Sequence, residues 1–245
     1  MGVVQIKICG MRRADEVEAA VEAGVDLIGF NFWPGTARYI APSEAVSLIR
    51  SVPSHIWTVG VFVDETPERV LEIAALTGVT VLQFHGSESP EYFERLGSIR
   101  LGSIRQGSIR QSAIRMIKAF KVTESFRADA LRAYGSAYAF LLDGYVAGGL
   151  PGGTGQVFDW SHARRAGEFG KVIVAGGLNA RNVAAAIRET QPWGVDVCSG
   201  VETAPGRKDA KLIREFIRVA REAEHYVPSR ELDTLAFARQ KRSAS

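Results

Sequence analysis

The residues closest to the N-terminus that could do chemistry are Lys7 and Cys9, within the apolar run 5–11. In a strand these two share one face, whereas Ile6 and Ile8 share the other. A free thiol has a pKa of about 8.5, so a cysteine base near neutral pH needs a stabilising charge, which Lys7 can supply. We therefore expect Cys9 to be a reactive group at a strand end, although a buried cysteine is more often inert packing.

Further polar residues fall near the ends of later strand-like runs: Asn31, Gln83, His85, Lys118, Asp143 and Asp196. If the strands line a barrel, we expect these side chains to point inward at its mouth, together with Lys7 and Cys9. Each alone has a structural explanation, and Lys7 with Asp196 would make an ion pair between the first and last strands. Asp143 is the candidate general acid, because apolar walls raise the pKa of a carboxyl group.

Two glycine-containing loops follow the last two predicted strands. Gly176 and Gly177 come after one, and Ser199 and Gly200 come after the other. In eight-stranded α/β barrels these loops often bind phosphate through backbone amides. Turns also need glycine, but its occurrence in both loops favours a phosphate site.

Two more loops carry candidate ligand-binding residues. Arg38 follows the second predicted strand and can grip a carboxylate with two hydrogen bonds, unless it is simply an exposed arginine. The glycine-rich loop after Asp143 includes Gly152, Gly153, Thr154 and Gly155. It is either a flexible connection or a lid that closes over the acid.

Apolar runs alternate with helical patterns along the chain. Strands are expected at 5–9, 27–32, 59–63, 81–84, 116–122, 138–142, 172–175 and 195–198. Helices are expected at 14–23, 43–52, 67–76, from 90 onward, 128–134, 159–169, 179–187 and 212–220. Eight strand-helix units predict a single α/β domain, a (β/α)8 TIM barrel. An open doubly wound sheet is the alternative, but it usually stops nearer six strands.

The barrel is expected to span 1–225, with two segments outside this rhythm. Residues 97–115 repeat a GSIR-like unit every five residues, a period that fits neither helix nor strand. This predicts a tandem insertion between the fourth helix and the fifth strand, and the alternative is a basic patch for an acidic partner. The basic, polar tail at 226–245 is expected to be a docked short helix or a frayed end.

Composition restricts the environment and the partners. The net charge of +3 includes the repeat's four arginines, so we infer no nucleic-acid binding. The two cysteines make no disulfide framework and favour the cytoplasm. No run approaches the ~18 apolar residues of a membrane span, and no export signal is visible, so no membrane partner is expected. A monomer or weak homodimer is expected.

Taken together, the motifs resemble the phosphoribosylanthranilate isomerases of tryptophan biosynthesis. The resemblance runs in order through 4–224 and leaves out only the repeat and the tail. The motifs that carry it are KICG at 7–10, GFNF at 29–32, TARYI at 36–40, GVFV at 60–63, LQFHG at 82–86, LD at 142–143, GGTG at 152–155, FDW at 158–160, AGGL at 175–178 and VDVCSGVE at 195–202.

The resemblance implies an Amadori rearrangement of a phosphosugar substrate on a TIM barrel, with no cofactor and no metal. It implies that Cys9 is the general base and Asp143 the general acid. Arg38 would hold the anthranilate carboxylate and the two glycine loops the phosphate, while Gln83, His85 and Asp196 would shape the pocket. The chain departs from the family pattern at Cys198, where a small polar residue is more usual, and in the Gly144-Tyr145 pair after the acid.

Two other functions are considered. The related histidine-pathway isomerase runs the same rearrangement, but an aspartate is expected there in place of Cys9. A barrel retained as a phosphosugar-binding or scaffolding module would tolerate replacement of Cys9 and Asp143, whereas an enzyme would not.

Overall fold

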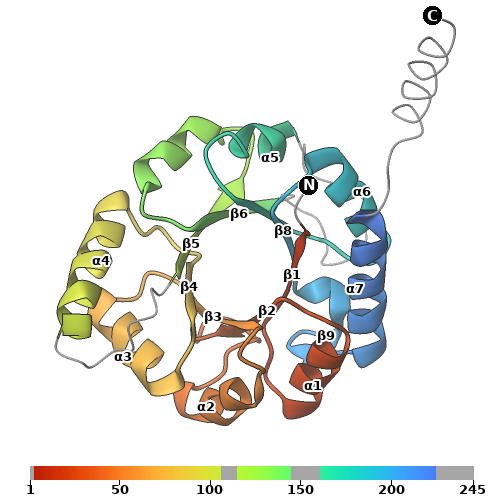
Figure 1. Ribbon diagram of the computed structural model, residues 1–245, viewed down its shortest axis with the longest axis horizontal. Coiled ribbons are helices and arrows are strands. Elements are labelled where there is room, and N and C mark those ends of the chain that lie inside the picture. The colour runs from red at the N-terminus through yellow and green to blue at the C-terminus, as the bar shows by residue number, and fades with distance from the viewer. Residues whose placement is uncertain (1–2, 106–114, 145–160, 225–245) are drawn as a thin grey trace, which may run out of the picture.

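Eight parallel strands close into a barrel in the computed structural model, which describes residues 3–105, 115–144 and 161–224. The strands are β1 (Gln5–Cys9), β2 (Leu27–Asn31), β3 (Trp57–Phe62), β4 (Val81–Phe84), β5 (Arg115–Val122), β6 (Ala139–Gly144), β7 (Val172–Ala175) and β8 (Gly194–Val197). Neighbouring strands pair in chain order, and β8 pairs with β1 to complete the ring (Figure 1). The predicted (β/α)8 barrel is confirmed.

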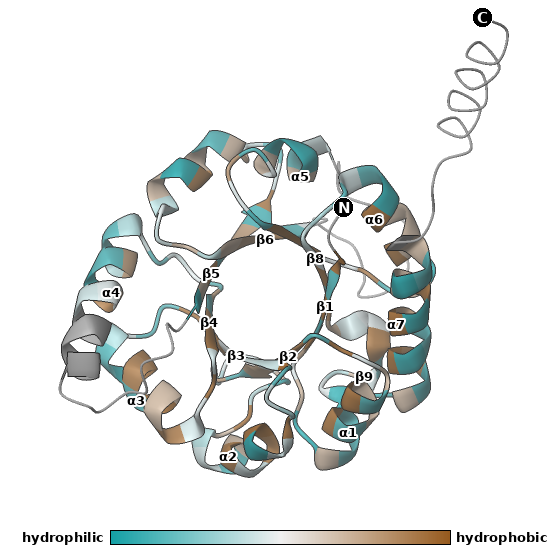
Figure 2. Cartoon of the chain, in the orientation of Figure 1, coloured by the Kyte–Doolittle hydropathy of each residue, from teal (hydrophilic) through white to brown (hydrophobic). Residues whose placement is uncertain are grey.

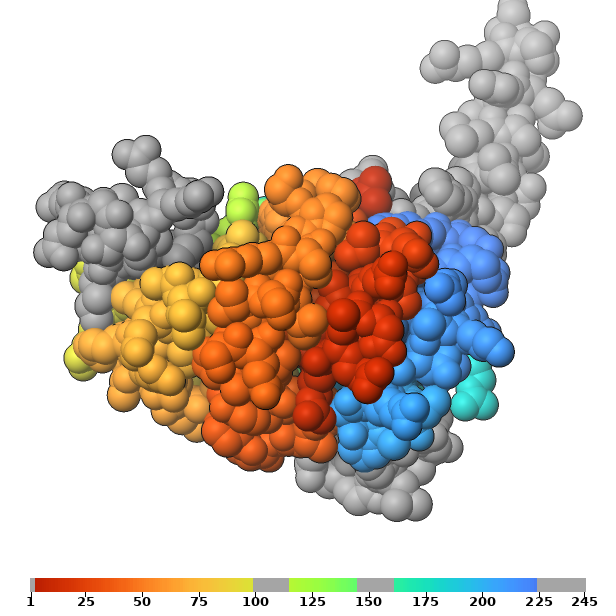
Figure 3. All heavy atoms as spheres, turned by 90° about the horizontal axis from the view of Figure 1, so that it is seen from below, coloured from red at the N-terminus to blue at the C-terminus, as the bar shows by residue number. Residues whose placement is uncertain are grey.

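Helices surround the ring of strands. They are α1 (Ala14–Glu22), α2 (Pro42–Ser51), α3 (Pro67–Thr77), α4 (Pro90–Arg105), α5 (Ser161–Ala166), α6 (Val183–Thr190) and α7 (Ala210–Glu224). Short 3-10 helices η1 (Ala128–Tyr134) and η2 (Ser199–Val201) follow β5 and β8, and η2 leads into the hairpin β9 (Glu202–Ala204) and β10 (Arg207–Lys208). The first and last described helices, α1 and α7, pack side by side (Figure 3).

Local sequence explains where α3 begins. The Thr66 side chain accepts a hydrogen bond from the Arg69 amide, and Pro67 occupies the first turn, where its missing N–H costs nothing. Gly78 ends the helix in the left-handed conformation that glycine adopts most easily. The N-terminal cap at Thr66 and the first turn at Pro67 agree with the prediction from this pair.

Each strand separates two apolar cores. Side chains such as Ile6, Ile8 and Phe30 pack outward against the helices, whereas Val59 and Val61 pack inside the barrel. Figure 2 accordingly shows mostly hydrophobic strands and helices that carry both kinds of residue. Because both faces are covered, burial of apolar surface stabilises the closed ring from two sides.

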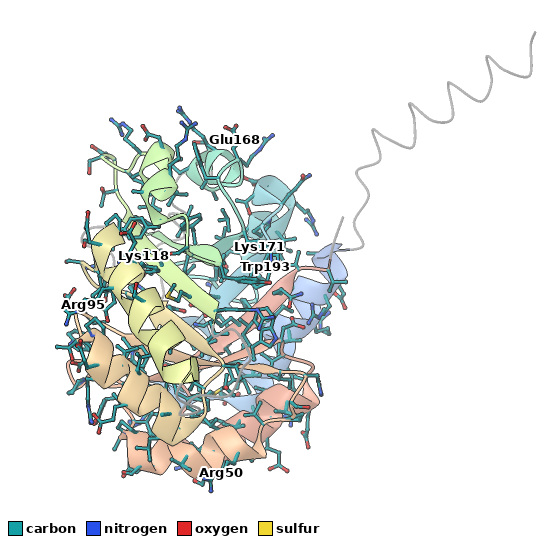
Figure 4. The ribbon with its side chains drawn as sticks, turned by 60° about the vertical axis from the view of Figure 1, so that its left-hand side comes forward. Arg50, Arg95, Lys118, Glu168, Lys171 and Trp193 are labelled. Carbon is teal, nitrogen blue, oxygen red and sulfur yellow. The ribbon has the colours of Figure 1, made fainter. Side chains whose placement is uncertain are left out.

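Aromatic rings close the N-terminal end of the barrel. Trp57, Tyr138 and Trp193 lie with their ring centroids 5.6 to 6.1 Å apart. The Arg115 guanidinium lies 4.2 Å from the Trp57 ring centre, and the Lys171 ammonium 3.8 Å from that of Tyr138. Figure 4 shows Lys171 beside Trp193. These rings pack against the barrel's inner core, so the chemistry of the barrel belongs at its other end.

The prediction that Lys118 points inward is wrong. On β5 the side chains of Ile117 and Ala119 fill the barrel, so Lys118 faces the helices (Figure 4). Its Nζ donates to Glu88 Oε2 at 2.8 Å and to the Gly86 carbonyl at 2.7 Å. The error has a physical cause: in a parallel strand that is buried on both faces, apolar residues occur at every position and do not reveal which face is inward.

The predicted connection at 97–115 also differs from the structure. Helix α4 continues through Gly97 to Arg105, and β5 begins at Arg115. An established helix extends at low cost, and the isoleucine, leucine and arginine residues of the repeat tolerate it, with only the glycines unfavourable by about 1 kcal/mol each. Residues 106–114, the predicted tail at 226–245 and the predicted lid at 152–155 lie outside the described residues.

The predicted helix cap at Asn179 is three residues before the observed cap, Asn182. Helix α6 begins at Val183, and residues 179–182 form a turn in which Asn182 Oδ1 accepts from the Asn179 amide at 2.8 Å. Asparagine is common both at helix caps and in such turns, so an asparagine alone does not distinguish a cap at 179 from a turn at 179–182. The turn lies directly after the glycine loop that follows β7.

Candidate active site

A cavity of about 260 Å³ lies at the C-terminal ends of the strands. Ten predicted site residues line it: Cys9, Asn31, Arg38, Gln83, His85, Asp143, Gly176, Gly177, Asp196 and Ser199. Cys198 lines it too, as do four residues to which no role was given: Thr36, Val61, Ala175 and Leu178. Of the predicted site residues that the structure describes, Lys7 and Gly200 are not part of the lining: Lys7 is fully buried, and Gly200 follows Ser199 in η2.

Cys9 and Lys7 lie together against the bare face of Gly29 on the neighbouring strand. A Cβ at Gly29 would stand 3.0 Å from the Cys9 sulfur and 3.2 Å from Lys7 Nζ, closer than side chains normally pack. Glycine therefore leaves the space that the thiol and the ammonium share. The predicted proximity of this cation to this sulfur is present in the structure.

The electrostatic surroundings favour the thiolate of Cys9. A hydrogen bond from Cys198 lowers the pKa of Cys9 well below its ordinary value, and the positive charges of Lys7 and Lys208 lower it further, against the opposing effect of burial. Donation of this hydrogen bond and burial raise the pKa of Cys198 itself. Of the two thiols, Cys9 is therefore the one that ionises first.

Lys7 and Asp196 form the predicted ion pair across the β1–β8 seam. Lys7 Nζ is 3.0 Å from Asp196 Oδ1, and the two residues are register partners on adjacent strands. Burial by itself would lower the pKa of Lys7, but the charges of Asp196 and Cys9 outweigh it and raise the pKa. Burial raises the pKa of Asp196 to about 7, although the Lys7 charge acts in the opposite direction. Lys7 thus stays charged beneath the cavity.

Asp143 takes part in a chain of polar side chains from β4 to β6. His85 Nε2 lies 3.3 Å from Asp143 Oδ2, and His85 Nδ1 lies 3.3 Å from Gln83 Nε2. The neighbours of Asp143 also include Gly176, where any Cβ would collide with the carboxylate and with the backbone of Gly144. The surroundings of the acid are thus more polar than the apolar walls expected from the sequence.

Two glycines in the loop after β7 have backbone amides that are free to bind a ligand. Gly176 and Gly177 have φ angles of 92° and 66°, in the left-handed region that glycine occupies without strain. Among the described residues neither N–H donates to an acceptor. Ser199, at the start of η2, lines the same cavity. Free amides in such a concave loop suit an anionic group of a ligand.

Arg38 stands at the edge of the cavity and already holds one carboxylate. Its Nε and Nη2 atoms donate to the two oxygens of Glu202, at 2.9 and 2.7 Å. Asn31, at the end of β2, accepts from the Trp33 amide at 3.0 Å and so also shapes the loop that carries Arg38. Arg38 is therefore fixed by its contact with Glu202 and also lines the cavity.

Sequence reasoning gave no role to Glu202 or Lys208. Lys208 Nζ donates to Glu202 Oε1 at 2.7 Å and to the Cys198 carbonyl at 2.9 Å, and its side chain is fully buried. Glu202 ends the last family motif, which was the available signal. For Lys208 no local signal exists, because its place depends on the fold of the β9–β10 hairpin.

With this geometry in place, comparison with known proteins is informative. The family described as N-(5'-phosphoribosyl)anthranilate (PRA) isomerase matches residues 6–219. The chain belongs to this family. A PRA isomerase from Desulforudis audaxviator is 46% identical over 219 residues, which cover 89% of this chain and 98% of the relative.

Solved structures of PRA isomerases agree. The enzyme from Thermotoga maritima superposes with a TM-score of 0.77 at 34% identity, over 89% of this chain and 99% of that chain. A second PRA isomerase structure holds reduced 1-(o-carboxyphenylamino)-1-deoxyribulose 5-phosphate and superposes with a TM-score of 0.73 at 32% identity, over 89% and 99% of the two chains. Both comparisons extend over nearly the whole described barrel.

The described residues include neither a group of metal-ligand side chains nor a membrane-spanning helix. Across 3–105, 115–144 and 161–224, no three histidine, cysteine or acidic side chains are grouped as a metal ion would need. In the same part of the chain no helix is long and apolar enough to cross a membrane.

Proposed function

We propose that this chain converts N-(5'-phosphoribosyl)anthranilate into 1-(2-carboxyphenylamino)-1-deoxyribulose 5-phosphate, with Cys9 as general base and Asp143 as general acid. Membership of the family makes the chain an isomerase. One observation supports the assignment of roles above all. Cys9 on β1 and Asp143 on β6 line the same cavity, and the pKa of Cys9 is lowered so that it is the group able to accept a proton.

The first step opens the sugar ring. Asp143 gives its proton to the ring oxygen while the bond between that oxygen and C1 breaks. The nitrogen lone pair forms a C=N bond to C1, which leaves a cationic imine. His85 Nε2 lies 3.3 Å from Asp143 Oδ2, so its ring can hydrogen-bond to the carboxylate that remains after the proton has left.

The second step moves a proton from carbon. The Cys9 thiolate takes the hydrogen from C2, and the electrons of that bond form a C1–C2 double bond and neutralise the cationic nitrogen. The resulting enol becomes the ketone when C1 takes the proton that Cys9 holds and the hydroxyl proton passes to the Asp143 carboxylate, which returns both groups to their starting protonation states. Lys7 and Cys198 support this step because they stabilise the thiolate in the free enzyme.

The remaining site residues bind and orient the substrate. Arg38 holds the carboxylate of the anthranilate ring, and the amides of Gly176, Gly177, Ser199 and Gly200 hold the phosphate. Asn31, Gln83, His85 and Asp196 form the walls, with Lys7 beneath them. Three points stay predictions: that 152–155 form a lid, that the protein is cytoplasmic, and that it is a monomer or a weak homodimer.

The test is a fluorescence assay in which a transferase makes the substrate in place from anthranilate and phosphoribosyl pyrophosphate. Adding this protein should accelerate the loss of substrate fluorescence. Cys9→Ala and Asp143→Ala should each lower turnover by about a hundredfold or more while the circular dichroism spectrum stays unchanged. A folded wild-type protein without activity would overturn the proposal. Unchanged turnover in either variant would overturn the role given to that residue.

A further inference from the structure

Arg38 uses only one of its two hydrogen-bonding edges. The Nε–Nη2 edge makes a two-point contact with the Glu202 carboxylate across 164 residues of chain. A guanidinium group has a second edge, formed by Nη1 and Nη2, that binds carboxylates in the same way. Among the described residues Nη1 has no partner, and the side chain, 26% exposed, lines the cavity. The second edge is therefore available to a ligand.

Glu202 also forms an ion pair with the buried Lys208. The Lys208 ammonium is 2.7 Å from Glu202 Oε1 and also donates to the Cys198 carbonyl at 2.9 Å. The Lys208 amide donates to Glu16 Oε1 at 2.9 Å, which fastens the hairpin to α1. The side chain of Glu202 is 4% exposed, so its carboxylate is held by Arg38 and Lys208 and not by solvent.

The charges of this group leave one positive charge for a ligand. Burial would raise the pKa of Glu202, but the hydrogen bonds from Arg38 and Lys208 outweigh it and lower the pKa. Glu202 is thus ionised, and its single negative charge faces two cations. Arg38, Glu202 and Lys208 together carry a net charge of about +1, part of which the nearby Cys9 thiolate offsets, and the free edge of Arg38 complements a carboxylate and not a neutral ring.

We propose that Glu202, clamped by Lys208, is a positioning residue that fixes Arg38 in the orientation that selects ligands carrying a carboxylate. This inference rests on the proposed function, which gives Arg38 the anthranilate carboxylate. The clamp acts on ligand selection through Arg38 and touches no reacting atom. A mobile arginine would lose more freedom on binding and would discriminate less between ligands with and without the carboxylate.

The experiment measures the binding of two ligands by calorimetry. One is the reduced product analogue, 1-(o-carboxyphenylamino)-1-deoxyribulose 5-phosphate, and the other is the same compound without the ring carboxylate. Glu202→Gln should weaken binding of the first by about tenfold and leave the second unchanged. In turnover, KM should rise by more than kcat falls, because Glu202 touches no reacting atom and reaches Cys9 only through Lys208 and Cys198.

Three further variants make the result decisive. Lys208→Met should shift discrimination in the same direction and serves if Glu202→Gln does not fold. Asp26→Asn is the matched control, since it removes a carboxylate from Arg221, a 2.6 Å ion pair at the opposite end of the barrel, and should not change discrimination. Arg38→Met should abolish discrimination, and if it does not, the role of Arg38 in the proposed function is wrong.

Two outcomes for the clamp would overturn the inference. Equal weakening of both ligands in Glu202→Gln would mean a merely structural role, and no change in either would mean that Arg38 needs no clamp. Failure of the wild-type protein to bind either ligand would instead reject the proposed function, on which the inference depends.

Discussion

The chemistry of this site involves a second cysteine, Cys198, which lines the cavity beside Cys9. A hydrogen bond with Cys198 is the largest influence that lowers the pKa of Cys9, and the Cys198 sulfur also lies 3.5 Å from Lys208 Nζ and 4.0 Å from Glu202 Oε1. A hydroxyl group would donate in the same place. A serine at this position would therefore keep the donor and change only its atom.

Replacement of Cys198 tests this directly. In Cys198→Ala, Cys9 loses the hydrogen bond that contributes most to lowering its pKa, so the acid limb of the kcat/KM profile should move to higher pH. Cys198→Ser keeps a donor and should restore a profile close to that of wild type. Identical profiles for the alanine variant and wild type would contradict the role given to Cys198.

Gly29 offers a second test, because it has no side chain and acts only by leaving space for its neighbours. Gly29→Ala places a Cβ 3.0 Å from the Cys9 sulfur and 3.2 Å from Lys7 Nζ, so both must move. A displacement of this kind at a catalytic base is expected to lower kcat/KM by about tenfold to a hundredfold. Thermal unfolding should show a folded protein, and full activity would show that the base tolerates displacement.

At the scale of elements, Lys118 is a structural residue of β5 and not a site residue. It is 3% exposed and bonded to Glu88, whose oxygens also accept from the amides of Asp64 and Gly86. Lys118→Met would leave the buried Glu88 carboxylate without its cation, with only the two amide donors, and should reduce the free energy of unfolding by about 3 kcal/mol. The measurement is urea unfolding, with kcat as control. Loss of kcat in folded protein would return Lys118 to the site.

The elements also show what the sequence could predict. Strand and helix alternation was readable, because glycine and proline mark the ends of α3 and the apolar runs mark the strands. Site residues on β1, β4, β6 and β8 were readable because polar side chains interrupt those runs. The inward face of β5 could not be predicted, since apolar residues occupy both of its faces. The Arg38–Glu202–Lys208 group could not be predicted either, since its members meet only through tertiary structure.

At the scale of the whole molecule, the buried pair Lys7–Asp196 couples the site to stability. The pKa of Asp196 is raised to about 7 from an ordinary value of 3.8, so the folded protein binds this proton more tightly than the unfolded chain. Its contribution to stability is therefore full below the ordinary value and is lost as the pH rises through about 7. Lys7 stays protonated throughout this range, because its pKa is raised.

This linkage predicts a pH-dependent difference between two proteins. The free energy of unfolding of wild type minus that of Asp196→Asn should fall as the pH is raised from 5 to 8, since asparagine keeps the shape but does not titrate. Urea unfolding at several pH values measures it. A difference that rises with pH would show that Lys7 lowers the pKa of Asp196 more than burial raises it.

The central claim is that Cys9 is a thiolate in the working enzyme, and its absorbance near 240 nm tests this most directly. The pH titration of wild type minus that of Cys9→Ala isolates this one sulfur. We expect its midpoint well below the ordinary thiol value of about 8.5, coinciding with the acid limb of kcat/KM. A thiolate that forms only above that value, in an enzyme fully active at neutral pH, would contradict Cys9 as the general base.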